Sequence, residues 1–233
     1  GTEWREALPN LLGTTAAVGI EPGLISPLVR TFIDSVVDAK RYRDVSPIIS
    51  EMRMVKSEEE LKIARHAGEV GIAMMEAGRG AIKEGVAEYE VALAATTAGT
   101  HKAAELLRTH YEGSQMSPSI HFMQILASGQ EITMTHHRVS IKRLKYGEPV
   151  FLCFCGMTDF HRFKLGFDRT FWIGEIADRS QEAAYQTAVD SQAAALSVLH
   201  PGVLAEEVHA AYAEVIQSAG FEYPFRCGRA TGF

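Results

Sequence analysis

Apolar residues recur along most of the chain with one of two spacings, and each spacing predicts one type of element. From Ser57 the spacing is helical, with a period of about 3.6 residues, and Ser57 with Glu60 forms the pattern of a capping box. The apolar stripe of this helix consists of Leu61, Ala64, Ala67, Gly68, Gly71, Met74 and Met75. Similar spacing predicts a helix from Glu88, another from Ser180, and one within "LHPGVLAEEVHAAYAEVIQSAG".

Strand-like runs lie between the second and the third of these helices. The runs "IHFMQILAS" and "EPVFLCFCG" predict strands, and the turn "LKYGE" precedes the second of them. The longer stretch "VFLCFCGMTDFHRFKLGFDRTFWIG" is interpreted as two apolar strands. This region therefore contains both helices and strands, and α+β is the fold class that we expect for it.

Residues 1–45 differ in pattern from the rest of the chain. "LLGTTAAVGIEPG" predicts a strand closed by a Pro-Gly turn, and "SPLVRTFIDSVVDAK" predicts a helix with Ser26 as N-cap and Pro27 at its first position. "RYRDVSPIISEMRMV" is interpreted as a connector. We expect residues 1–45 to be the C-terminal part of an α/β N-terminal domain with a linker, its beginning absent since the chain starts with Gly1, and residues 46–233 to form a second domain.

The helical regions of the second domain contain an internal repeat. "EGVAEYEVALAA" and "PGVLAEEVHAAY" share residues at one constant offset. The matched pairs are Gly85 with Gly202, Val86 with Val203, Glu90 with Glu207, Val91 with Val208, and Ala94 with Ala211. The repeat is too long for a solenoid and predicts two similar halves, with a cleft between them as a common place for a site. Chance similarity between Ala-rich helices is the alternative explanation.

Composition and charge narrow the classes of function. The 233 residues are 46% hydrophobic and 22% charged, an ordinary globular balance. The formal net charge is −6 and the 23 basic residues are spread along the chain, so we expect no nucleic-acid partner. No apolar run reaches the roughly 20 residues of a membrane span, so no membrane association is expected. Three cysteines do not make a disulfide framework and suit a reducing cytoplasm.

The strand region contains several candidate functional side chains. Cys153 and Cys155 lie on one strand face and outline a zinc site with Asp159 and His161, although structural zinc favours C-x-x-C spacing and buried cysteines act mostly as small apolar residues. A nucleophilic role for Cys153 is a further alternative. Asp168 interrupts a strand of alternating aromatic residues, which favours a functional role over a simple ion pair with a neighbour.

Six motifs, in one order along the chain, resemble the family of creatinase, methionine aminopeptidase and aminopeptidase P. They are "MVKSEEELKIARHAGEV", "EGVAEYEV", "LKYGEPVFL", "DRTFWIGE", "HPGVLAEEVHAAY" and "CGRATGF". The resemblance covers residues 46–233. It implies the pita-bread fold, in which two αββ halves surround a curved antiparallel sheet, and usually a homodimer. The internal repeat agrees with this architecture.

Most members of that family are dinuclear metallopeptidases, and the resemblance locates the positions of their ligands. The first two ligands, both Asp, fall on Cys153 and Gly166, and the histidine of the family's G-H-G-I-G motif falls on Arg229. A guanidinium is a permanent cation and does not bind a metal. The last two ligands, both Glu, fall beyond Phe233. The resemblance therefore implies no metal cofactor, and the alternative is a pair of divalent ions such as Mn or Co.

Creatinase, the metal-free branch, is the more similar in site pattern. The resemblance places its substrate carboxylate partner on Asp168 and its histidine base, eleven residues before the turn glycine, on His136, with the adjacent His137 as an alternative. It implies that His136 activates water for C–N hydrolysis while Asp168 holds cationic nitrogens. Arg229 is a candidate clamp for a substrate carboxylate or a structural partner of an acid, and Cys153 is a candidate substrate contact.

The sequence thus predicts a metal-independent, creatinase-like hydrolase that cleaves a C–N bond in a small, nitrogen-rich, carboxylated metabolite. One open alternative is a metal-dependent Xaa-Pro dipeptidase or aminopeptidase that recruits Asp159, His161 and Asp168 as ligands. Another is a non-catalytic binding module with the same pita-bread fold. The expected partners are a small-molecule substrate and a second copy of the chain, and the expected location is the cytoplasm.

Overall fold

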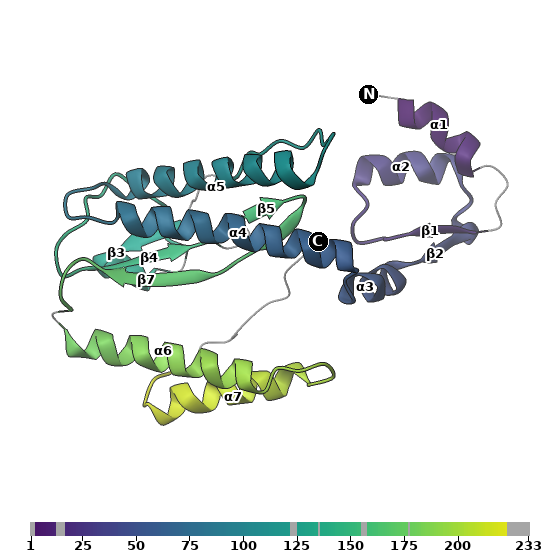
Figure 1. Cartoon of the computed structure of the whole chain (residues 1–233). Coiled ribbons are helices and arrows are strands. Elements are labelled where there is room, and N and C mark those ends of the chain that lie inside the picture. The colour runs from purple at the N-terminus through teal and green to yellow at the C-terminus, as the bar shows by residue number, and fades with distance from the viewer. Residues whose placement is uncertain are drawn as a thin grey trace. The chain divides into compact units, whose positions relative to one another are not determined.

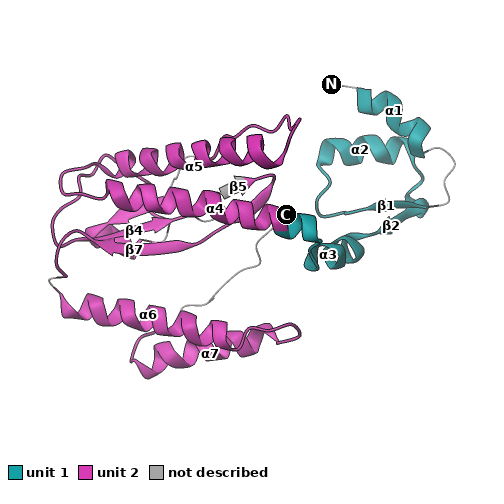
Figure 2. Cartoon of the chain, in the orientation of Figure 1, with its two compact units in different colours: residues 1–61 teal, residues 62–233 magenta. Residues whose placement is uncertain are grey.

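The chain divides into two compact units, Gly1–Leu61 and Lys62–Phe233 (Figure 2). The computed structural model describes residues 3–12, 17–121, 125–134, 136–154, 158–176 and 178–222. Within these ranges no helix combines the length and the apolar character that crossing a membrane requires. The predicted domains 1–45 and 46–233 stay a proposal.

The first unit contains two short parallel strands and a small apolar core. Its elements are α1 (Glu3–Leu12), β1 (Val18–Ile20), α2 (Pro27–Val36), the 3-10 helix η1 (Ala39–Arg41), β2 (Tyr42–Asp44) and α3 (Ser46–Met54). Val18, Ile33 and Val37 are buried together. The predicted start of α2 is confirmed, because the Ser26 hydroxyl accepts a hydrogen bond from the Val29 amide and proline occupies the first turn.

Two expectations for this unit were wrong. The predicted strand of "LLGTTAAVGIEPG" begins too early, because Leu11 and Leu12 end the helix α1. Leu8 and Leu12, four residues apart, lie on one helical face and pack against the small core, which favours the helix there. The predicted connector contains β2 and α3, because Tyr42 pairs with Val18 of β1 and Pro47 stands in the first turn of α3.

Two long helices open the second unit, as the sequence predicts. They are α4 (Glu58–Ala81) and α5 (Glu88–His110). The capping box of α4 is confirmed, since the Ser57 amide donates to the Glu60 carboxylate over 2.8 Å and the Glu60 amide donates to the Ser57 hydroxyl over 3.2 Å. Of the predicted apolar stripe, Ala67, Gly71 and Met74 are buried.

A three-stranded antiparallel sheet packs against these helices (Figure 1). Its strands are β3 (Ile125–Ser128), β4 (Pro149–Cys153) and β7 (Asp168–Trp172), in the order β3-β4-β7, and the 3-10 helix η2 (Gly129–Thr133) follows β3. Leu126, Val150 and Leu152 are fully buried in one core with residues of α4 and α5. Because side chains alternate along a strand, the intervening residues point to the face of the sheet that α4 and α5 do not cover.

The connection between β4 and β7 contains a second hairpin, so the stretch predicted as two strands holds four. The additional strands are β5 (Thr158–Phe160) and β6 (Phe163–Leu165). The two residues of their turn, His161 and Arg162, have φ values of 50° and 64°, the left-handed region that this tight turn requires. The His161 ring packs against Tyr111, with 4.3 Å between ring centroids, and this contact holds the turn against the end of α5.

The helices α6 (Arg179–Ser197) and α7 (Ala205–Ser218) pack against each other. The start of α6 lies one residue earlier than predicted, because Asp178 is the N-cap and accepts from the Ser180 amide. The repeat has a structural counterpart: Gly85 and Gly202 have φ values of 80° and 89°, and each precedes the N-cap of α5 or α7 by two residues. Both copies of the Gly-Val motif therefore end in the same turn and helix start.

Buried histidines predict a loss of stability in mild acid. Burial lowers the pKa of His66 and that of His161, and the neighbouring His110 lowers the pKa of His66 further. The unfolded chain therefore takes up protons as pH falls through about 6.5, before the folded chain does. Stability is complete above that pH and decreases below it. We expect the Tm to fall between pH 7.5 and pH 5.5, and to fall less in His161→Phe, which keeps the ring packing without a titrating group.

The control for this prediction is His101→Phe, because His101 is an exposed residue of α5. Its removal should leave the difference in Tm between the two pH values unchanged. If the Tm of the parent protein and that of His161→Phe fall equally between the two pH values, His161 does not contribute to the loss of stability in acid.

A candidate active site on the open face of the sheet

A pocket of about 300 Å³ lies on the face of the sheet opposite α4 and α5. Its lining consists of Ile125, Ala127, Ile132, Thr133, Met134, His136, His137, Phe151, Cys153 and Asp168. The strand residues in this set alternate with the core residues Leu126, Val150 and Leu152, so the pleat of the sheet itself separates core from pocket. Four of the predicted candidates, two histidines, a cysteine and an aspartate, are therefore brought together.

Asp168 stands at the first position of β7, directly opposite Cys153 of β4 in the strand register. The neighbouring Arg169 does not neutralise it: the guanidinium donates to the main-chain carbonyl of Asp168 over 2.7 Å and lies 5.7 Å from the ring centroid of Phe167. Within the described part of the chain, the Asp168 carboxylate takes part in no hydrogen bond or ion pair. This exposed carboxylate is available to a ligand in the pocket.

The two histidines differ in how they are held. His136 is exposed and has a φ of 58°, a left-handed conformation that is uncommon for a residue other than glycine and is concentrated at functional sites. His137 is half-buried, and its Nδ1 lies 3.1 Å from the Leu126 carbonyl oxygen. A carbonyl only accepts, so Nδ1 of His137 carries the proton of this bond. His137 thus anchors the loop to β3, while the His136 ring remains free to contact a ligand.

An ion pair holds η2, which supplies Ile132 and Thr133 to the pocket wall. The Lys142 ammonium donates to the Glu131 carboxylate over 2.5 Å and to the Ser128 carbonyl over 2.6 Å, and the Glu148 carboxylate lies 3.7 Å away. The hydrogen bond from Lys142 lowers the pKa of Glu131. The wall of the pocket is therefore fixed by charge-assisted contacts outside it.

The remaining predicted site residues either lie outside the described part of the chain or are not among the described lining of this pocket. Arg229 and Cys155 lie outside the described residues, as does the side chain of Asp159. His161 packs against Tyr111 and Phe160 and does not line the pocket with Cys153, which gives no support to the predicted zinc grouping. In the described ranges, no three His, Cys, Asp or Glu side chains are arranged to hold a metal ion.

The donors of this pocket do not fit a dinuclear metal centre. Hard divalent ions are held by several oxygen ligands, and the described lining offers one carboxylate, Asp168. Cys153 is a buried thiol at the position that the resemblance gives to the first aspartate, and Gly166, at the position of the second, has no donor side chain.

Sequence reasoning missed most of the pocket wall. Ile132, Thr133, Met134 and Phe151 were not predicted as site residues, although they line the pocket. Phe151 could have been found by strand alternation, since it is two residues from Cys153 and shares its face. No sequence pattern marks the residues of η2, because a short 3-10 helix does not repeat often enough to show a periodic spacing of apolar residues.

Comparison with known proteins agrees with this fold. The profile of metallopeptidase family M24 matches residues 62–233. The agropine synthesis cyclase of Rhizobium rhizogenes is 30% identical over 230 residues, which cover 94% of this chain and 57% of that protein. The Xaa-Pro dipeptidase of Pyrococcus furiosus is 26% identical over 212 residues, covering 91% and 56%.

Solved structures show the same fold over nearly the whole chain. The X-Pro aminopeptidase of Thermotoga maritima superposes with a TM-score of 0.76 at 22% identity, covering 94% of this chain and 58% of that one. The chain spans little more than half the length of these curated relatives. The ordered motifs, the helix-backed antiparallel sheet with its pocket and the profile match lead to one conclusion: the chain has the pita-bread fold and belongs to metallopeptidase family M24.

Proposed function

We propose that this pocket cleaves a C–N bond in a small, nitrogen-rich, carboxylated metabolite by hydrolysis that needs no metal. The observation that carries the proposal is the Asp168 carboxylate, which faces the pocket without an ion-pair partner in the described residues. A lone carboxylate in a small pocket suits a planar cationic group such as a guanidinium or amidinium, because it accepts two parallel hydrogen bonds from it. The described lining contains no Lys or Arg that would compete for it.

The proposed reaction uses His136 as base and then as acid. Its imidazole takes a proton from a water molecule as the water oxygen bonds to the electrophilic carbon, and then gives that proton to the departing nitrogen. The C–N bond breaks with its electron pair on the nitrogen, the hydroxyl left on the carbon gives its proton to the released amine or to solvent, and a carbonyl group and an amine result. Asp168 holds the cationic nitrogens and orients the carbon toward the water.

The remainder of the substrate is assigned by chemistry. We propose that Arg229 clamps the substrate carboxylate, since a guanidinium matches it with two donors, and that Cys153 contacts the substrate from the pocket floor. A homodimer and a cytoplasmic location complete the proposal. The dimer is supported by the resemblance to the creatinase group, and the location by the small number of cysteines, three in the whole chain.

A second candidate function is ring closure or ring opening at the same site. It is supported by the agropine synthesis cyclase, whose name describes a cyclisation and which is 30% identical to this chain. When ring closure expels water, it is the reverse of a hydrolysis, and the same base and acid serve in both directions. The two candidates differ in the substrate and not in the roles of His136 and Asp168.

Metal removal separates the metal-free proposals from peptidase activity. The protein, purified without a chelator, is analysed for metals and then assayed with and without EDTA on guanidinium- and amide-bearing carboxylates including creatine, on agropine, and on Ala-Pro. We expect no tightly bound divalent ions and turnover unaffected by EDTA. Turnover of agropine alone would select ring chemistry. Two tightly bound divalent ions per chain, or Mn²⁺-stimulated cleavage of Ala-Pro, would contradict both candidates and support an Xaa-Pro peptidase.

A further inference from the structure

Glu88 is a fully buried acid that neither the pocket lining nor the proposed reaction uses. It stands at the first position of α5, and the described partners of its carboxylate are all donors. Oε1 accepts from the Ser128 hydroxyl over 2.8 Å, and Oε2 accepts from the Ser140 hydroxyl over 2.6 Å and from the Ser140 amide over 3.0 Å. Three donors and the positive end of a helix satisfy a negative charge that would otherwise be costly to bury.

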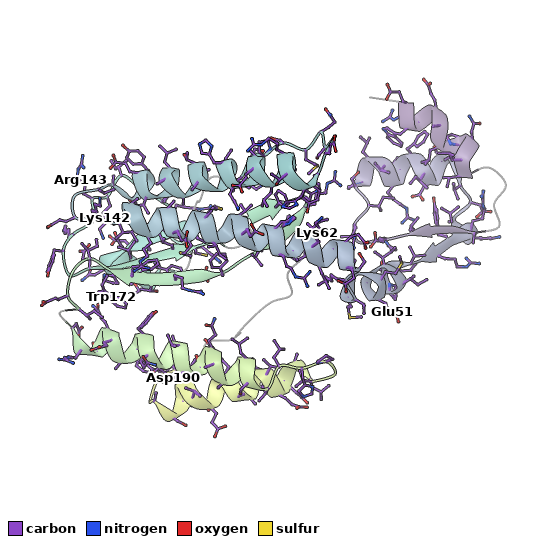
Figure 3. The ribbon with its side chains drawn as sticks, in the orientation of Figure 1. Glu51, Lys62, Lys142, Arg143, Trp172 and Asp190 are labelled. Carbon is purple, nitrogen blue, oxygen red and sulfur yellow. The ribbon has the colours of Figure 1, made fainter. Side chains whose placement is uncertain are left out.

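Glu88 binds the segment around Ser140, and this segment directly follows the loop that contains His136 and His137, called the histidine loop below. Ser140 follows His136 by four residues, and Arg138 forms a bridge with Ile125 of β3. The segment then caps α5 with its main chain: the Glu88 amide donates to the Lys142 carbonyl over 3.0 Å and the Tyr89 amide to the Ser140 carbonyl over 3.1 Å. Lys142 and Arg143 stand together beyond the end of the sheet in Figure 3.

The N-terminus of α5 lacks the usual side-chain cap. Its N-cap residue is Ala87, which has no side-chain oxygen, so only the second half of a capping box exists: the Ala87 amide donates to the Glu90 carboxylate over 2.7 Å. The loop carbonyls supply what a Ser or Asp would supply elsewhere. Because helix and loop satisfy one another's polar groups, the position of the loop is set by the start of α5.

We propose that Glu88 is a positioning residue that fixes the His136 loop over the pocket from behind the sheet. The inference rests on the proposed function, because it gives His136 its role as base. Glu88 touches neither the pocket nor a reacting atom; it acts through Ser140 and Ser128, which join the loop, the end of β3 and the start of α5. Loosening this junction displaces His136 while the pocket wall of β4 and β7 stays in place.

The test compares Glu88→Ala, Glu88→Gln and Ser140→Ala by hydrogen exchange and by turnover of the probe that the parent protein hydrolyses. In Glu88→Ala three donors lose their acceptor, so we expect the Ser140 and Tyr89 amides to exchange about 10- to 100-fold faster and kcat to fall about 10-fold or more, with KM little changed. Glu88→Gln should restore both, because its Oε1 can accept from Ser140 and its Nε2 can donate to Ser128. Ser140→Ala removes one donor to Glu88 together with the hydroxyl that accepts from the Lys142 amide, and it should give a smaller change of the same kind.

Glu90→Ala is the matched control, because Glu90 is an exposed acid in the same first turn whose carboxylate, among the described residues, binds the Ala87 amide alone and does not contact Ser140 or Ser128. It should leave exchange at Ser140 and kcat unchanged. If Glu88→Ala does not fold, Ser140→Ala decides the question, because unchanged exchange at position 140 and at Tyr89 in that variant would overturn the inference. Unchanged exchange at Ser140 in folded Glu88→Ala and Ser140→Ala would overturn the inference. If no probe is turned over, the function proposal fails, but the exchange data still show whether Glu88 fixes the loop.

Discussion

Replacing Asp168 by asparagine is expected to lower kcat/KM for a guanidinium-bearing probe by about 100- to 1,000-fold, the range for losing one partner of a charge pair that the bound probe shields from water. The amide keeps the size of the side chain but loses the charge and one of the two acceptor oxygens, so it no longer matches a planar cation. Most of the loss should appear as a higher KM, because Asp168 holds the substrate before and during the reaction. Steady-state kinetics on the active probe measures the division between KM and kcat.

The structure supplies a matched control for this variant. Asp190 is an exposed residue of α6 whose carboxylate accepts from the Gln186 amide over 2.8 Å, and it does not line the pocket. Asp190→Asn makes the same chemical change elsewhere and should leave kcat/KM unchanged (Figure 3). Because the Arg169 guanidinium does not contact the Asp168 carboxylate, Asp168→Asn should also leave the Tm nearly unchanged. Full activity in Asp168→Asn would remove Asp168 from the proposed mechanism.

Replacing His136 by alanine is expected to lower kcat by about 100- to 10,000-fold, the usual contribution of a general base and acid. KM should change little, since the imidazole contributes to proton transfer more than to binding. The His136 side chain is exposed, so its removal takes no packing from the core, and the variant should remain folded.

His137→Ala distinguishes the two adjacent histidines. Its Nδ1 is engaged with the Leu126 carbonyl, so its loss should reduce stability and loosen the loop, with a smaller effect on kcat than His136→Ala. His101→Ala, at an exposed position of α5, controls for loss of an imidazole in general. If His137→Ala abolished turnover while His136→Ala left it intact, the base would be His137. The assignment of the base to His136, which the resemblance implies, would then be wrong.

The helix starts that could be predicted from the sequence are those set by capping residues close to them in the chain. Ser57 and Glu60 form the capping box that their spacing predicts, and Ser26 with Pro27 starts α2 as expected. Such signals are reliable because partner and target lie within one helical turn. Prediction failed where the spacing of apolar residues fits both a strand and a helix. Leu11 and Leu12 were predicted in a strand but end α1, because one face of that helix packs against the small core of the first unit.

The sequence allowed prediction of the polar residues of the site but not of the apolar and η2 residues that line the rest of the pocket. The family resemblance pointed to His136, Cys153 and Asp168, and they line one pocket. Ile132, Thr133 and Met134 join them only because Lys142, Glu131 and Ser128 hold η2 against the end of β3. Arg229 lies outside the described residues, so its predicted role stays a prediction.

The sequence by itself determined the starts of α2 and α4, the Gly85 and Gly202 turns of the repeat, and the family to which the motifs point. These depend on short-range backbone geometry and on residue order, which a sequence carries directly. Only the tertiary structure decided that Asp168 stands opposite Cys153 on the open face of the sheet and that buried Glu88 ties α5 to the histidine loop. Strand register and buried polar contacts join residues far apart in the chain, and they are selected by the packing of the whole core and not by any local pattern.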